Sequence, residues 1–491
     1  MPTRKVSIAE VMDHSGVAFG TSGARGLVTA MTDEVCYTYT RGFLQYLERE
    51  REIARGGQVA VAGDLRSSTP RIMRAVMKAI VDHGSTPING GRVPSPAVAL
   101  YGFDKRIPSI MVTGSHIPDD RNGIKFNRPS SELLKRDEPG MKEQVVELPA
   151  DFDAKGATLA AAQRSEPALE AVIEQRYVQR YFDAFGEGAL TGARIGLFEH
   201  SAVGRDICFQ VLSGLGAQVT RLGRSDAFIP VDTEAIRPED VASAARWGKE
   251  HDFDTIVSTD GDSDRPLVSD EHGKWLRGDV AGIVTAEFLG ATFVATPVSC
   301  NTAVEKSGAF KRVARTRIGS PYVIEAMNGA LGGSEKVVGY EANGGFLTAT
   351  DFSFAGRLPA LPTRDALLVH LAVLLSARAR RVSISKLLAA LPQRFTASDR
   401  LEDFPTALSK ERLGALAQGG APAIAKEFPD FGKVSDVSNV DGLRVTFASD
   451  EIVHLRPSGN APELRCYTEA SSEARAVELN EEALRVLRGW R

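Results

Sequence analysis

The chain has 491 residues, of which 43% are hydrophobic and 25% are charged, and these proportions exclude a disordered or fibrous protein. Its 59 Lys and Arg against 63 Asp and Glu give a net charge of −4 without a long basic run, so nucleic acid is not an expected partner. The longest apolar stretches, such as residues 366–377, are shorter than the about 20 residues that a membrane span needs. We therefore expect no membrane partner.

The length predicts several domains, because a single hydrophobic core stops growing near about 250–300 residues. Residues 1–14 are polar and lack the apolar stretch of a secretory signal. The four cysteines are far apart and show neither metal-ligand nor disulfide spacing: Cys36, Cys208, Cys300 and Cys466. We expect reduced thiols in a cytoplasmic protein.

Short β-rich runs alternate with amphipathic helices as far as residue 340, a pattern typical of α/β domains with largely parallel sheets. Three successive units are predicted: strands 58–64 and 109–114 around helix 69–83; strands 194–200 and 254–259 around a helix from residue 204; strands 293–298 and 336–340 around a helix near residue 301. The last strand of each unit runs into a polar loop. We therefore predict three related α/β domains.

The last hundred or so residues follow a different pattern. Strands at 443–448, 452–455 and 464–468 are predicted to form an antiparallel meander. A closing helix from about Ser472 would place Val477, Leu484 and Leu487 on its apolar face. The irregular segment 128–167 is predicted to be an insertion or a linker. The expected domains are residues 1–175, 176–291, 292–392 and a smaller α+β domain at 393–491.

The first polar loop, residues 113–118, reads T-G-S-H-I-P and follows a buried strand. Ser115 directly after such a strand would be exposed and rigid, as a nucleophile must be. Lys125 follows an Asn-Gly turn, so the chain can fold back and bring it toward Ser115. The alternative is a solvated loop that caps the sheet.

The second loop carries Asp260, Asp262 and Asp264 at alternate positions after an apolar strand. Small residues between the aspartates allow all three carboxylates to face one hard cation, at the strand end where α/β folds bind ligands. Mg²⁺ is the natural cation for carboxylate oxygens that act on a phosphate. The alternative is a set of Asx-turns without metal.

Two further loops offer groups for a sugar and a phosphate. In the third, residues 339–346, Glu341 and Asn343 could bond vicinal hydroxyls, unless the loop is only a glycine-rich turn. The fourth loop, residues 456–462, could cradle a phosphate, or it could be a tight turn with surface arginines. The cradle would use side chains and exposed backbone N–H groups from Arg456, Ser458, Gly459, Asn460 and Arg465.

These four loops, in this order and spacing, resemble the α-D-phosphohexomutase superfamily of phosphomannomutases, phosphoglucomutases and phosphoglucosamine mutases. The segment FGTSGARG (19–26) is similar to the family's opening motif, and GDLRSST (63–69) also looks like a family segment. The family motifs T-A-S-H-N-P, D-G-D-G-D-R and R-P-S-G-T-E-P match residues 113–118, 260–265 and 456–462. The resemblance spans nearly the whole chain.

The chain departs from these motifs without losing a reacting group. Gly114, Ile117 and Ser263 stand where the family usually has Ala, Asn and Gly, and Asn460-Ala461 replaces Thr-Glu. In the third loop Asn343 stands where Ser is common, and Gly345 stands where His is frequent. Together the segments GYEANGGF, FIPVDTEA (228–235) and LPTRDA (361–366) look most like bacterial phosphomannomutases.

The resemblance implies three α/β domains with mixed sheets and a smaller fourth domain around a central cleft. It implies interconversion of mannose 6-phosphate and mannose 1-phosphate through a phosphoserine at Ser115 and a hexose 1,6-bisphosphate, which also serves as activator. Mg²⁺ would be held by Ser115, Asp260, Asp262 and Asp264. Arg25 and Arg265 would add cationic donors, and Lys125 would be the general base and acid, assisted by His116. A cationic site is expected to lower the pKa of Lys125.

Other functions fit the same sequence. A phosphoglucomutase or a phosphoglucosamine mutase would differ in one or two contacts to the sugar. A non-catalytic sugar-phosphate binder would keep the fold, and a phosphatase would hydrolyse the phosphoenzyme. In each case hexose phosphates are the expected partners of a monomer or homodimer.

Overall fold

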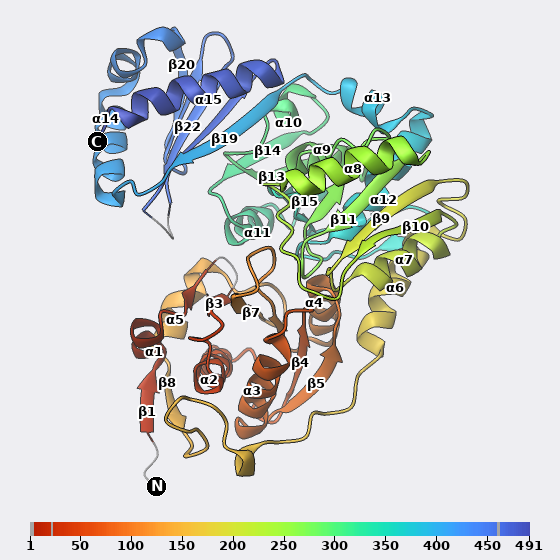
Figure 1. Cartoon of the computed structure of the whole chain (residues 1–491), viewed down its shortest axis with the longest axis vertical. Coiled ribbons are helices and arrows are strands. Elements are labelled where there is room, and N and C mark those ends of the chain that lie inside the picture. The colour runs from red at the N-terminus through yellow and green to blue at the C-terminus, as the bar shows by residue number, and fades with distance from the viewer. Residues whose placement is uncertain (1–3, 21–22, 459–461) are drawn as a thin grey trace.

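The computed structural model describes residues 4–20, 23–458 and 462–491. The chain passes through its sheets in sequence order (Figure 1). The N-terminal part contains β1 (Arg4–Ser7), α1 (Ile8–Ser15), β2 (Ala18–Phe19), β3 (Gly23–Leu27), α2 (Asp33–Arg49), β4 (Gln58–Gly63), α3 (Thr69–Asp82), β5 (Thr86–Gly91), α4 (Ser95–Lys105), β6 (Ser109–Val112), β7 (Arg121–Asn127), α5 (Glu138–Lys142) and β8 (Val145–Leu148).

The second sheet and its helices comprise α6 (Val172–Phe185), β9 (Arg194–His200), α7 (Arg205–Gly214), β10 (Gln218–Arg224), α8 (Pro238–Glu250), β11 (Thr255–Thr259) and β12 (Pro266–Val268). The third part comprises α9 (Gly278–Phe288), β13 (Phe293–Pro297), α10 (Ala303–Lys306), β14 (Arg312–Thr316), α11 (Ser320–Gly329), β15 (Val337–Tyr340), β16 (Phe346–Thr348), β17 (Phe352–Ser353), β18 (Arg357–Leu358), α12 (Ala366–Arg380) and α13 (Ile384–Ala389). The C-terminal part comprises β19 (Phe395–Leu401), α14 (Thr406–Glu427), β20 (Val434–Ser438), β21 (Leu443–Phe447), β22 (Ile452–Pro457), β23 (Leu464–Ala470) and α15 (Glu473–Arg488).

Three sheets repeat one topology. Their strands lie in the orders β5–β4–β6–β7, β10–β9–β11–β12 and β14–β13–β15–β16. In each set of four the first three strands in sequence are parallel and the fourth is antiparallel to the third. The first sheet continues beyond β7 with the antiparallel strands β3 and β2. The prediction of three related α/β domains with mixed sheets is therefore confirmed. The three polar loops all join the third strand to the fourth, so they occupy equivalent places.

The C-terminal sheet is antiparallel, in the order β19–β23–β22–β21–β20, and the predicted meander is its β21–β22–β23 part. Helix α15 covers it with Leu479, Leu484 and Leu487. The placement of Val477 on the apolar face is wrong, because its side chain is 47% exposed. The buried residues of this helix repeat at three- and four-residue steps from Ala476, and Val477 lies one step off that stripe.

Segment 128–167 is in part a structural element. Its strand β8 pairs antiparallel with β1 and so fastens the N-terminal strand to the first domain. The chain then runs along the surface to α6 (Figure 1). The prediction of a linker therefore holds for the part after β8.

The first three domains share apolar packing, whereas the fourth has a core of its own. One buried cluster contains Ala60 and Met111 of the first sheet, Ile195 of the second and Val294 of the third. The C-terminal core is a separate cluster around Phe447. The fourth domain also meets the third through polar contacts: Thr302 N–H to Glu469 (3.1 Å), Lys306 to Asp450 (2.6 Å) and Ile318 N–H to Asp441 (3.0 Å). Among the described helices, none is both long and apolar enough to cross a bilayer.

Two buried histidines support the strand that leads into the aspartate loop. The Nε2 atoms of His200 and His370 lie 2.8 and 2.9 Å from the carbonyl oxygens of Thr259 and Ser258. Because a carbonyl only accepts, each Nε2 carries the proton. Neither Nδ1 has a hydrogen-bond partner in the described part of the chain. Burial lowers the pKa of each imidazole to about 4, so both rings are neutral at neutral pH.

Acid should therefore destabilise the protein. An unfolded histidine binds a proton near about pH 6.5, whereas these folded ones bind it only near pH 4. Between these values the unfolded chain holds more protons, so stability falls as the pH falls. We expect calorimetry to show a lower Tm at about pH 5 than at about pH 7, with a smaller difference in His370→Gln. An equal pH dependence in that variant would contradict this account.

Candidate active site

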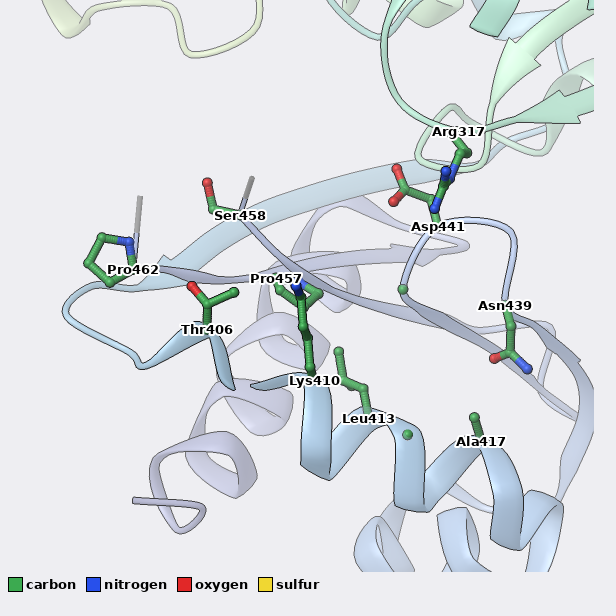
Figure 2. Close-up of a pocket in the computed structure, with 12 residues that line it drawn as sticks. Arg317, Thr406, Lys410, Leu413, Ala417, Asn439, Asp441, Pro457, Ser458 and Pro462 are labelled. Carbon is green, nitrogen blue, oxygen red and sulfur yellow. The ribbon is translucent and has the colours of Figure 1, made fainter. Parts of the chain in front are cut away.

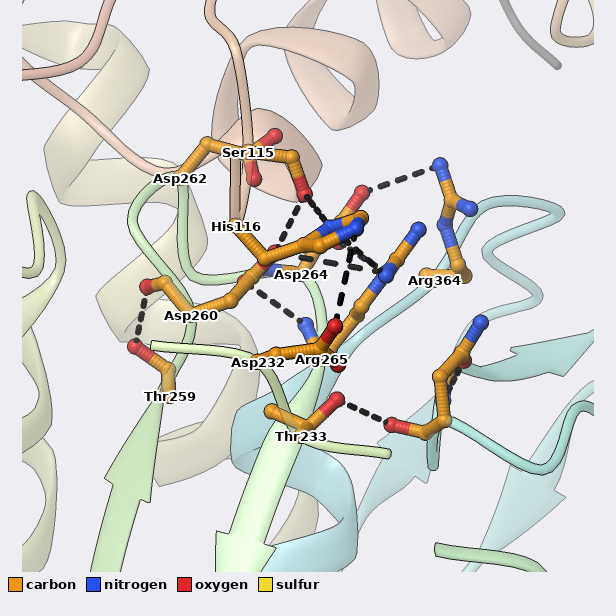
Figure 3. A network of polar contacts seen from close by, with 12 residues as sticks. Ser115, His116, Asp232, Thr233, Thr259, Asp260, Asp262, Asp264, Arg265 and Arg364 are labelled. Carbon is orange, nitrogen blue, oxygen red and sulfur yellow. Dashed lines mark hydrogen bonds and ion pairs between the residues drawn. The ribbon is translucent and has the colours of Figure 1, made fainter. Parts of the chain in front are cut away.

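The first two polar loops meet at one point. The Ser115 hydroxyl, in the β6–β7 loop, donates to Asp260 Oδ2 of the β11–β12 loop at 2.5 Å (Figure 3). Ser115 is only 1% exposed, so the expectation of an exposed serine is wrong, because the second domain covers the strand end. Its φ of 57° is unusual for a residue with a side chain. The Thr113 hydroxyl holds this turn by accepting from the Ser115 N–H at 2.8 Å.

The three aspartates are arranged as a cation site. Asp260, Asp262 and Asp264 are buried, and they offer carboxylate oxygens that lie within 4.8 Å of one another. The oxygens Asp262 Oδ1 and Asp264 Oδ1 have no hydrogen-bond partner among the described residues. Burial and the two neighbouring carboxylates raise the pKa of Asp260. A hard divalent cation fits this donor set, because it would satisfy the free oxygens and neutralise the excess charge.

Lys125 lies on β7 and reaches the same aspartates. Its Nζ is 2.5 Å from Asp262 Oδ2 and 2.6 Å from Asp264 Oδ2. Burial alone would lower the pKa of Lys125, but these two carboxylates overcome that effect and raise it. The expected lowered pKa is therefore wrong for this structure, because the amine faces anions more closely than cations. The predicted return of the chain toward the serine loop is correct.

His116 and the two predicted arginines line the same site. Arg265 Nη1 donates to His116 Nδ1 at 2.9 Å, so this nitrogen is an acceptor. Burial and the Arg265 charge lower the pKa of His116 to about 3, which keeps the ring neutral. Arg25 lies on β3, opposite Gly123 of β7. Burial, followed by the charges of Arg265, Arg66 and Arg364, lowers the pKa of Arg25 to about 10. Such a concentration of cations favours an anionic ligand.

The third loop reaches the site through an arginine that we did not predict. Glu341 is 4% exposed, and Arg364 Nη1 lies 3.5 Å from its Oε2. The other end of this guanidinium, Nη2, lies 3.1 Å from Asp264 Oδ2. Asn343 belongs to the same loop, where its carbonyl accepts from the Thr233 hydroxyl at 2.7 Å. The signals available in the sequence were the segments 361–366 and 228–235, which contain Arg364 and Thr233.

The fourth loop lies in the C-terminal domain, beside a separate cavity. Arg456 and Arg465 are directly opposite each other on β22 and β23, and Arg456 Nε lies 2.9 Å from Asp441 Oδ2. The cavity has a volume of about 750 Å³ and is lined by residues that include Arg317, Lys410 and Ser458 (Figure 2). Sequence motifs gave no signal for Arg317, Lys410 or Asp441. Gly459 and Asn460 lie outside the described residues.

A second unpredicted arginine holds the serine loop. Arg66 is 1% exposed and pairs with Asp64 at 3.1 Å. Its guanidinium also donates to the carbonyls of Ser115 and Ile117 at 2.9 and 2.5 Å. A Cβ at position 114 would lie 2.6 Å from Arg66 Cζ. An alanine at position 114, which the family usually has, would therefore require the Arg66 guanidinium to shift in this chain.

Comparisons with known proteins agree with this site. A buried serine that donates to a loop of carboxylates is an arrangement that an enzyme of phosphoryl transfer can use. Three family models match the chain: phosphoglucomutase/phosphomannomutase alpha/beta/alpha domain I at residues 16–147, domain III at 277–395 and the C-terminal domain at 386–486. The chain belongs to the phosphoglucomutase/phosphomannomutase family, whose members are intramolecular phosphotransferases.

Two relatives are similar over nearly their full length. A phosphomannomutase from Sinorhizobium fredii is 42% identical, with 96% of this chain and 99% of the relative covered. A phosphomannomutase from Salmonella muenchen is also 42% identical, with 97% and 96% covered. The fold is similar to the crystal structure of a phosphoglucomutase/phosphomannomutase family protein from Burkholderia thailandensis, with a TM-score of 0.74, 20% identity and 96% of each chain covered.

Arg66→Met should destabilise the protein strongly. The substitution leaves the buried Asp64 carboxylate without its cation, which costs about 3–5 kcal/mol in other buried pairs. Urea unfolding should show this loss, while the exposed control Lys105→Met should change stability by less than about 0.5 kcal/mol. A loss for Arg66→Met no larger than that of the control would show that Arg66 does not hold the loop.

Proposed function

We propose that this enzyme is a phosphomannomutase, which interconverts mannose 6-phosphate and mannose 1-phosphate. The contact between the Ser115 hydroxyl and Asp260, at 2.5 Å, carries the proposal. It puts a nucleophile beside a buried carboxylate cluster, as a phosphoserine mechanism requires. The choice of mannose is supported by the two phosphomannomutases that are 42% identical.

Phospho-Ser115 would donate its phosphoryl group to the free hydroxyl of the substrate and form a hexose 1,6-bisphosphate. After the bisphosphate has turned round, Ser115 would take back the other phosphoryl group. The bisphosphate thereby returns the serine to its phosphorylated state, and this accounts for its expected role as activator. The same site must accept both orientations of the sugar.

Mg²⁺ would be held by Asp260, Asp262, Asp264 and an oxygen of the Ser115 phosphate, and would neutralise charge on the transferring group. The free oxygens of Asp262 and Asp264 support this assignment. The guanidinium groups of Arg25 and Arg265 would bind the same phosphoryl group. Both belong to the cluster of cations around the serine loop.

Lys125 would move the proton of the attacking hydroxyl, as general base and acid. The carboxylates of Asp262 and Asp264 raise its pKa in this structure, so the amine holds a proton there. His116 would assist as a neutral ring whose Nε2 carries the proton, since its Nδ1 accepts from Arg265.

The remaining predicted residues would bind the substrate away from the reacting phosphate. Glu341 and Asn343 would bond the sugar hydroxyls. The non-reacting phosphate would be held by the fourth loop, with Arg456, Ser458, Gly459, Asn460 and Arg465.

We also propose that the four domains comprise residues 1–175, 176–291, 292–392 and 393–491 and surround a central cleft, and that the protein is a monomer or a homodimer. The four free cysteines are all buried, which suits the proposed cytoplasmic location.

The first test compares three substrates and follows Ser115. Coupled assays should give a higher kcat/KM for mannose 1-phosphate than for glucose 1-phosphate or glucosamine 1-phosphate. Incubation with a hexose 1,6-bisphosphate should add about 80 Da, the mass of one phosphoryl group, to the peptide that contains Ser115. A preference for glucose or glucosamine phosphate would identify the corresponding mutase instead. Release of inorganic phosphate without isomerisation would identify a phosphatase, and no turnover at all would indicate a non-catalytic binder.

The second test removes the cation site. Asp262→Asn should abolish the increase in Tm that Mg²⁺ gives to the wild type, and it should lower kcat by about 100-fold or more, because a ligand of the cation is lost. The matched control is Asp252→Asn, whose carboxylate is 87% exposed and should leave both properties unchanged. Full activity of the wild type in excess chelator would exclude the proposed role of the cation.

A further inference from the structure

Arg364 bridges two loops that come from different domains. Its guanidinium lies 3.1 Å from Asp264 of the aspartate loop and 3.5 Å from Glu341 of the third loop. The side chain is 3% exposed, and Figure 3 shows it beside Asp264. Since both carboxylates are buried as well, the three groups form a nearly solvent-free row of alternating charge.

The chain has made space for this side chain. A Cβ at position 345 would lie 2.4 Å from Cδ and 2.7 Å from Cγ of Arg364. Gly345 is not among the glycines with positive φ, so its backbone conformation does not require glycine. The space taken by Arg364 requires it. The family often has histidine here; in this chain any side chain at position 345 would compete with Arg364 for the same space.

The backbone next to Arg364 is held rigidly. The neighbouring Asp365 caps helix α12 and accepts from the hydroxyl groups of Tyr177 (2.8 Å) and Tyr181 of helix α6. On the other side, the Thr363 hydroxyl donates to the buried Glu132 at 2.8 Å. With its backbone held on both sides, the guanidinium can fix the two carboxylates in relation to each other.

Two buried atoms of this bridge have unused hydrogen-bonding capacity. Arg364 Nε and Glu341 Oε2 make no hydrogen bond within the described part of the chain. Buried polar atoms are normally satisfied, so the charge on Glu341 Oε2 depends on the Arg364 guanidinium 3.5 Å away.

We propose that Arg364 is a positioning residue of the mutase reaction: it sets the separation between the cation ligand Asp264 and the sugar ligand Glu341, in the space that Gly345 leaves open. This inference rests on the proposed function of the site. Losing an outer partner of a metal ligand typically costs about 10- to 100-fold in metal affinity or activity. Arg364 therefore links the affinity for the cation to the binding of the sugar.

Arg364→Met and Arg364→Lys test the bridge. Both variants should bind Mn²⁺, used as a spectroscopic substitute for Mg²⁺, about tenfold or more weakly, as measured by electron paramagnetic resonance without substrate. Their kcat should fall by about 10- to 100-fold. Lysine keeps the charge but lacks the fork that reaches two carboxylates, so Arg364→Lys should recover less than half of the loss in Mn²⁺ affinity. Wild-type Mn²⁺ affinity in Arg364→Lys would show that only the positive charge of Arg364 matters, and not its fork of two donors.

Gly345→Ala tests the same bridge without removing the arginine. The added Cβ should displace the guanidinium, so Mn²⁺ affinity and kcat should fall as they do in Arg364→Met. In the Arg364→Ala background the alanine should cost less than about twofold, because the Cγ and Cδ atoms that the added Cβ would meet are gone. Equal costs of Gly345→Ala in both backgrounds would overturn the coupling. If Gly345→Ala alone folds poorly because of the clash, the double variant should fold better, since the clashing side chain is removed. The comparison of single and double variants therefore still tests the coupling.

The control is Arg128→Met. Arg128 also bridges two carboxylates, Glu52 and Asp137, but both lie outside the four loops. It should lower the Tm and leave Mn²⁺ affinity unchanged. Wild-type Mn²⁺ affinity and kcat in Arg364→Met would overturn the inference. If the wild type failed to convert any hexose phosphate but Mn²⁺ affinity still followed Arg364, the proposed function would fail and the bridge to the cation site would stand.

Discussion

The carboxylates of Asp260, Asp262 and Asp264 are buried side by side in one loop, and the rest of the site compensates their charge. Lys125 comes from the first domain and pairs with Asp262 and Asp264. Arg364 comes from the third domain and pairs with Asp264. Because an unpaired buried charge is very costly, the aspartate loop can keep this conformation only when all three domains are in place. The same charges that need compensation create the site for a cation.

The repeated sheet topology explains why the loops meet. In each of the three sheets a candidate functional loop follows the last parallel strand and precedes an antiparallel strand. The parallel strands direct these loops to one edge of each sheet, where α/β folds bind ligands. A shared apolar core holds the three sheets together. One structural unit, used three times, therefore supplies the loops to which we assign the nucleophile, the cation site and the sugar site.

Sequence reasoning found the groups to which we assign the reaction but not those that hold them. Ser115, Lys125 and the three aspartates follow strand ends whose hydrophobic pattern is plain, and the structure brings them together. The side chains of Arg66 and Arg364 occupy the space beside Gly114 and Gly345. These contacts join residues that are far apart in sequence or lie in different loops, so no local sequence pattern reveals them. The burial of Ser115 and the raised pKa of Lys125 were missed for the same reason, since both depend on another domain.

The attachment of the fourth domain differs from that of the other three, and this difference suits the proposed reaction. Its contacts with the third domain include the polar groups of Glu469, Asp450 and Asp441, and its own core is separate. Polar interfaces of this kind allow domains to move relative to each other. A bisphosphate that must turn round between two transfers needs its distant phosphate released and bound again. Placing Arg456 and Arg465 on the separately attached domain lets that anchor move while the buried charge network keeps the reacting groups fixed.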